Sequence, residues 1–123
     1  MIEDHGGELL VGEALVVKTN HADIPYMISA PTMRVPMILK DTVNVYLATK
    51  AIIRTAINHP DICNVAIPGM GTGVGRVSPE ICARQMKAAF DAIANPIFPL
   101  TWRETQIQHQ NLCGNIIRDL QEE

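Results

Sequence analysis

Two short apolar runs mark the start of the hydrophobic pattern along the chain. The run Gly12–Thr19 contains Ala14-Leu-Val-Val17, and the run Ile24–Ala30 follows the polar segment Asn20-His-Ala-Asp23. Asn and Asp favour turns because their side chains bond nearby backbone groups and tolerate left-handed conformations. The pattern therefore predicts two strands joined as an antiparallel hairpin. Because both runs are apolar on both faces, we expect helices to cover each side of their sheet.

A helix and a third strand are predicted after the loop Thr32–Leu39, which Pro31 and Pro36 keep irregular. Asp41 or Thr42 is a suitable cap for a helix that ends near Asn58. Its apolar positions at helical spacing are Val43, Tyr46, Leu47, Ile53 and Ile57. The apolar run Ile62–Ile67 lies between two prolines and is too short for a helix, which favours a buried strand. A strand, a helix and a strand in this order predict a parallel, right-handed crossover.

The last part of the chain is predicted to be helical. Ser78-Pro79-Glu80 is typical of a helix start, and Asn95-Pro96 ends that helix. Its expected apolar stripe is Cys82, Met86, Ala89, Phe90 and Ile93. Thr101-Trp-Arg-Glu104 fits a capping box for a further helix in the tail 97–123, with Trp102 as an expected core anchor.

The composition narrows the class of protein. At 123 residues and 47% hydrophobic content, the chain has the length and apolar content of a single domain, residues 1–123. A net charge of −3 without a basic run makes nucleic acid an unsuitable partner. No apolar stretch approaches the length of a membrane span, and no basic, apolar leader follows Met1, so we expect a cytoplasmic protein that does not bind membranes.

Metal and cofactor chemistry has little support in the sequence. The three cysteines, Cys63, Cys82 and Cys113, form no CxxC pair, so we expect them to be reduced and buried. The four histidines have no spacing typical of metal ligands. We therefore expect no metal and no bound cofactor.

The glycine-rich segment before the helix at Ser78 is the strongest candidate for a functional site. Glycines let a backbone approach a ligand closely, so that successive N–H groups point at one anion while the helix N-terminus adds partial positive charge. Dinucleotide and Walker A patterns are excluded, because Arg76 stands where the third glycine is needed and no Gly-Lys-Ser/Thr follows. A tight turn that needs glycine for shape alone remains the alternative. The candidate ligand-binding residues are Gly69, Gly71, Thr72, Gly73, Val74, Gly75 and Arg76.

Several motifs in order resemble the macro domain, an ADP-ribose-binding family. The resemblance covers a core of residues 8–93, and the tail 97–123 is similar to the helical tail of a bacterial and phage branch. The segment Ala30-Pro-Thr-Met-Arg-Val-Pro-Met37 resembles that branch in particular. The motifs are Gly12-Glu-Ala-Leu-Val-Val-Lys-Thr19, Ile24-Pro-Tyr-Met-Ile-Ser-Ala-Pro31, Val65-Ala-Ile-Pro68, Gly71-Thr-Gly-Val74 and Ser78-Pro-Glu80. In macro domains, the loop that matches Gly71–Val74 wraps the diphosphate of ADP-ribose through backbone amides.

The resemblance implies binding without catalysis by this chain. Macro domains begin with strands that carry an adenine-binding aspartate and, in hydrolytic members, an asparagine-containing segment, and neither has a counterpart here. We therefore expect a truncated, non-catalytic domain. The alternatives are an ADP-ribosyl hydrolase whose catalytic segment is missing or supplied in trans, and a non-binding structural remnant. Arg76 occupies a position where glycine is usual in the family. Its guanidinium either clamps a phosphate or blocks the approach of the ligand. Arg34 is expected to be a solvated surface residue.

The implied fold is a truncated three-layer α/β/α domain with a mixed sheet of about three remaining strands and a helical tail. In macro domains, a strand without a counterpart here lies between the strands that resemble Ile24–Ala30 and Ile62–Ile67. Unpaired backbone groups on two apolar strands are costly. The chain therefore closes the gap directly, borrows a strand from a second copy or a partner, or stays partly unfolded. We expect self-association, because direct closure disturbs the packing of the crossover helix.

Overall fold

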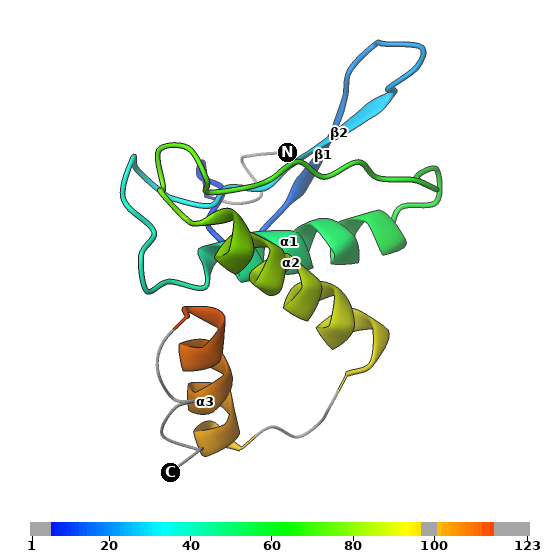
Figure 1. Ribbon diagram of the computed structural model, residues 1–123. Helices are drawn as coiled ribbons and strands as arrows, with labels where there is room; N and C mark the ends of the chain where they lie inside the picture. Colours follow the sequence, from blue (N-terminus) through cyan, green and yellow to red (C-terminus); the bar gives the residue numbers. More distant parts are fainter. Residues whose placement is uncertain (1–5, 97–100, 115–123) are drawn as a thin grey trace.

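The computed structural model describes residues 6–96 and 101–114, in which two strands and three helices form (Figure 1). Strands β1 (Leu15–Lys18) and β2 (Tyr26–Ser29) pair antiparallel, with Val16 opposite Ile28. The helices are α1 (Asn44–Ile57), α2 (Pro79–Ala94) and α3 (Trp102–Leu112). The chain is therefore a small α/β fold, as the sequence predicts.

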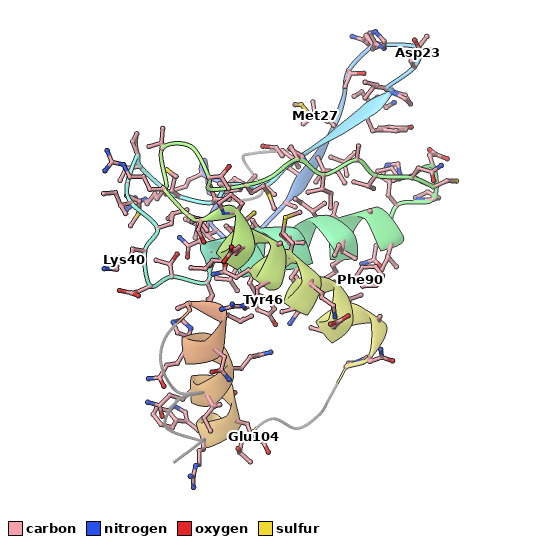
Figure 2. All side chains as sticks on the ribbon, in the orientation of Figure 1. Asp23, Met27, Lys40, Tyr46, Phe90 and Glu104 are labelled. Atoms are coloured by element: carbon pink, nitrogen blue, oxygen red, sulfur yellow. The ribbon has the colours of Figure 1, made fainter. Side chains whose placement is uncertain are left out.

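The predicted hairpin is confirmed, although its strands are shorter than the apolar runs. Asn20 adopts a left-handed φ of 61°, and His21 Nδ1 accepts hydrogen bonds from the backbone N–H groups of Asp23 (3.2 Å) and Ile24 (3.3 Å). The expectation that helices cover both faces of the strands is wrong. The described strand residues are half-buried or exposed, and Figure 2 shows Met27 and Asp23 on a hairpin that extends away from the helices.

The predicted third strand does not form, so the sheet has two strands rather than about three and is antiparallel rather than mixed. Residues 62–70 follow an irregular path without sheet pairing, and the chain from α1 to α2 runs beside α1 in Figure 1. Among the described residues, no hydrogen bond involves the backbone of residues 63–69. A strand requires a partner strand for its N–H and C=O groups, and β2 pairs only with β1. The crossover and the three-layer arrangement are therefore not seen in this part of the chain.

Helix α1 begins close to the predicted start, where Thr42 Oγ1 accepts from the N–H of Asn44 at 3.5 Å, and a second N–H of its first turn is bound from another helix. Val43 at the N-cap offers no side-chain bond, and the backbone N–H of Tyr46 donates to Gln85 Oε1 on α2 at 3.1 Å. The predicted apolar face of α1 is partly wrong, because Ile57 is exposed. The buried residues of this helix are Val45, Ala48, Thr49, Ala51 and Ile52. Small residues on that face let α1 and α2 pack side by side.

The predicted caps of α2 and α3 are confirmed. Ser78 Oγ accepts from the N–H of Ile81 at 3.2 Å, with proline at the first helical position. Thr101 and Glu104 form the complete capping box. The expected burial of two aromatic residues is wrong, since Phe90 is 59% exposed and Trp102 is 79% exposed. The predicted tail at 97–100 and 115–123 lies outside the described residues.

The core of the described chain lies where α1, α2 and the glycine-rich loop meet. Its central residues are Leu39, Val45, Val77 and Cys82, with Met33, Met70, Ile81 and Met86 packed around them. Gln85 is also buried there, and its Nε2 donates to the carbonyls of Thr42 (3.0 Å) and Leu112 (3.1 Å). The amide thereby joins the start of α1, the middle of α2 and the end of α3. This arrangement fixes the base on which the loop rests.

Candidate functional site

The glycine-rich loop lies directly over the core and is held there by its own carbonyl groups. The carbonyl of Gly71 accepts from the N–H of Val77 (2.9 Å), and that of Gly75 accepts from the N–H of Leu39 (2.8 Å). A third bond joins the N–H of Arg76 to the carbonyl of Gly73 (3.1 Å). The loop therefore has a defined shape and leads into α2.

Two glycines of the loop are required by the fold itself. Gly71 has a φ of 71°, and a Cβ placed on it would lie 3.0 Å from Val45 Cγ2. A Cβ on Gly75 would lie 2.7 Å from the carbonyl oxygen of Gly71 and 2.9 Å from Leu39 Cδ1. These two positions face the core, where the loop is pressed against buried side chains. They fit the alternative in which glycine serves the turn alone.

The other two glycines have no such internal reason. A Cβ on Gly73 would meet nothing within 4 Å, and one on Gly69 would meet only Thr72 Oγ1 at 3.8 Å. Neither residue has a positive φ, so the sequence expectation that glycines here supply left-handed conformations holds only at Gly71. The loop therefore alternates between glycines that face the core and glycines that face open space.

The backbone N–H groups of residues 71–75 have no acceptor among the described residues, and of these residues only Gly75 is buried. Within residues 6–96 and 101–114, no hydrogen bond is donated by the N–H groups of residues 71–75, whereas the Gly71, Gly73 and Gly75 carbonyls are used. Val74 at the loop tip is exposed. The first turn of α2 follows shortly after, and a helix N-terminus carries partial positive charge. Several N–H donors and a helix start on one segment suit an anion such as a phosphate.

The two candidate arginines have different environments. Arg76 is exposed and has a φ of 56°, which is unusual for a residue with a side chain. Arg34 instead pairs with Glu8, with 2.5 Å between Nε and Oε1, and its side chain is 73% exposed. Glu8 raises the pKa of Arg34 through this hydrogen bond and by its charge. Arg34 is therefore the surface residue that the sequence predicts, and Arg76 is the basic residue of the loop.

Burial of all three cysteines was expected, and this is wrong for Cys63, which is exposed. Cys82 and Cys113 are buried, and burial is the main cause that raises the pKa of the Cys113 thiol. Cys82 lies beneath the loop, where its Sγ accepts from the N–H of Met70 at 3.4 Å. The residues described by the structure contain no group of three or more side chains suited to hold a metal ion.

A small polar cluster that the sequence reasoning missed joins the hairpin to the end of α1. The Tyr26 hydroxyl donates to Asp61 Oδ2 at 3.2 Å, and this bond raises the pKa of Tyr26. The rings of Tyr26 and His59 lie 4.8 Å apart, and His59 Nδ1 accepts from the N–H of Asp61. The separation of 35 residues between Tyr26 and Asp61 leaves no local sequence signal for this contact. The cluster anchors the start of the 62–67 segment to β2.

The fold and the loop define a small α/β protein with a glycine-rich turn ahead of a helix. Residues 1–86 match the family described as "Macro domain", which is more than half of the chain. The chain therefore belongs to the macro domain family.

Two relatives of this chain, from two organisms, are both described as "Uncharacterized protein". The protein from Aquifex aeolicus (strain VF5) is 40% identical over 76 residues, which are 62% of this chain and 46% of the relative. The protein from Aeropyrum pernix is 37% identical over 79 residues, which are 64% of this chain and 41% of the relative. The matched region thus spans less than half of each relative. No solved structure matches.

Membrane insertion by a helix has no support within residues 6–96 and 101–114. None of the helices formed by these residues is long and apolar enough to cross a bilayer.

Proposed function

We propose that this chain binds ADP-ribose, or a related nucleotide diphosphate, through the loop Gly69–Arg76 and without catalysis. The observation that carries the proposal is the open outer side of the loop. Gly73 has open space where a side chain would stand, Gly69 would meet only Thr72 Oγ1 at 3.8 Å, and the N–H groups of residues 71–75 donate to no described residue. Membership of the macro domain family adds ADP-ribose as the ligand class. The segment Ala30–Met37 supports a place in the bacterial and phage branch.

The contacts proposed for the diphosphate are backbone donors supplemented by one cation. The amides of Gly71, Thr72, Gly73, Val74 and Gly75 surround the anion, and the Arg76 guanidinium pairs with a phosphate oxygen. A loop of this kind orients a phosphate but supplies neither a positioned water nor a general base. The proposal therefore assigns binding to this chain and assigns no hydrolytic residue.

Amide NMR spectra recorded during an ADP-ribose titration test the proposal. We expect the signals of residues 71–75 to shift first, with a dissociation constant of about 1 mM, on the order of 4 kcal/mol of binding free energy. Gly73→Val should abolish these shifts while the helical spectrum is kept, because the added side chain enters open space that the ligand needs. Ala22→Val, in the hairpin turn, is the matched control and should bind normally.

Four outcomes contradict the proposal. Shifts confined to residues far from the loop, or unchanged affinity in Gly73→Val, would show that the loop is not the site. Absence of any ADP-ribose binding by a well-folded protein would favour a structural remnant. Hydrolysis of ADP-ribosylated protein by the purified chain, lost in Gly73→Val, would favour the enzymatic alternative.

A further inference from the structure

The segment 62–67 has the character of a strand but has no partner strand among the described residues. Four consecutive residues of the segment, Cys63 to Ala66, are exposed to solvent. The flanking Ile62 and Ile67 are half-buried. Val65 is 42% exposed, although it is a β-branched residue of high strand propensity. No described group pairs with the backbone of residues 63–67. The segment therefore presents unused donors and acceptors together with apolar side chains.

Natural proteins usually protect such an edge, and this segment lacks the usual protection. Exposed edges are blunted by charged side chains, by bulges or by prolines within the strand. The six residues 62–67 contain no charge, no proline and no glycine. Pro60 and Pro68 stand outside the segment, so they limit the length of pairing without preventing it. The chemistry that fits this edge is another extended, uncharged strand.

The same segment of a second copy meets this requirement. Directly opposed residues of an antiparallel pair point to the same face of the sheet, so the two-fold axis must lie between one residue and its own copy. With Val65 as that residue, each Val65 lies opposite the other Val65, each Cys63 lies opposite an Ile67, and each Asn64 lies opposite an Ala66. On the face that carries Cys63, Val65 and Ile67, apolar side chains then meet apolar side chains, and no like charges are opposed on either face. A two-fold contact is self-complementary and closes on itself, so it produces a dimer and nothing larger.

We propose that two copies of this chain associate by antiparallel pairing of their 62–67 segments. The Tyr26–Asp61 hydrogen bond of 3.2 Å holds the start of each segment against its own hairpin. The pairing supplies the backbone partners that the segment lacks. The loop Gly69–Arg76 follows two residues later, so both copies carry it beside the shared strand pair. The inference concerns assembly and does not depend on what the loop binds.

Hydrogen exchange and sedimentation of the full chain, each at several protein concentrations, test the proposal together. We expect a monomer–dimer equilibrium, and we expect exchange of the amides of residues 63–67 to slow as the dimer forms. Alkylation of the exposed Cys63 should slow in parallel. The signal reports on Cys63, because Cys82 and Cys113 are already buried. Val65→Lys should raise the dimer dissociation constant by about tenfold or more, because it places two like charges near the two-fold axis.

Val35→Lys is the matched control, since Val35 is an equally apolar, exposed residue of another loop. It should leave the dimer unchanged. A monomer at every concentration overturns the proposal, and protected 63–67 amides in that monomer would indicate closure onto β2 instead. A dimer whose 63–67 amides exchange freely, or species larger than a dimer, also overturns it.

Discussion

Truncation of Gln85 is expected to be among the most damaging single changes in the described core. The side chain is 1% exposed and makes hydrogen bonds to the N–H of Tyr46 (3.1 Å) and to the carbonyls of Thr42 (3.0 Å) and Leu112 (3.1 Å). Gln85→Ala leaves three backbone groups without this partner, and an unsatisfied buried group costs about 1–3 kcal/mol. Allowing for partial access of water, we expect a loss of about 3–5 kcal/mol from a total of about 5–15 kcal/mol.

Gln85→Glu keeps the volume of the side chain but removes the amide donor, so it tests the hydrogen bonds alone. A carboxylate at this place faces two carbonyl oxygens and is buried, so the folded state favours the protonated acid and raises its pKa above about 4.3. The folded state then binds more protons than the unfolded state above that pH. The free energy of unfolding of this variant must therefore fall as pH rises, by up to about 1.4 kcal/mol for each pH unit until the folded pKa is passed.

Urea unfolding followed by circular dichroism, at a series of pH values from acid to neutral, measures both effects. Gln106→Glu on the exposed surface of α3 is the matched control, and its stability relative to the parent should be nearly independent of pH. A loss below about 1 kcal/mol in Gln85→Ala, or a Gln85→Glu variant as insensitive to pH as the control, would refute the role given to these bonds.

Two further predictions concern the loop. Gly71→Ala should lower the free energy of unfolding by about 2–4 kcal/mol in urea titrations, because a left-handed φ and overpacking against Val45 act together, whereas Gly73→Ala should change it by less than about 0.5 kcal/mol. Equal losses in the two variants would contradict the division of the loop into core-facing and open glycines. Arg76→Gly should raise the melting temperature slightly, because it relieves a left-handed φ of 56°. The gain in stability is up to about 1 kcal/mol after the conformational entropy of glycine is subtracted. The affinity for ADP-ribose should fall. A gain in affinity would show instead that Arg76 blocks the ligand.

Local signals in the sequence were sufficient for the helix starts. Ser78-Pro79 and the Thr101–Glu104 box predict α2 and α3, because a cap and the N–H group that it binds lie within one turn of each other. The hairpin turn at Asn20 was predicted for the same reason. The glycine loop was located by its composition and its place before a helix. Which of its glycines face open space was not, because that depends on Leu39 and Val45, which are distant in sequence.

Non-local partners explain the errors. The strand predicted at 62–67 has the right residues, but strand formation depends on a neighbour that the composition of the segment does not specify. Helical spacing predicts Phe90 on the buried stripe and the capping box predicts Trp102 as a core anchor, but their exposure depends on which helix faces meet. Gln85 carries no local signal of its role, because its partners lie at the ends of α1 and α3, which only the fold brings to it.

The hairpin stands apart from the buried cluster, and this separation gives the molecule two levels of stability. The central core residues Leu39, Val45, Val77 and Cys82 include none from β1 or β2. A lone two-stranded hairpin is marginal in water, so local opening of β1–β2 requires far less free energy than unfolding of the helices. The glycine loop rests on the helical unit through Leu39 and Val77. The hairpin can therefore open and close many times while the loop keeps its shape.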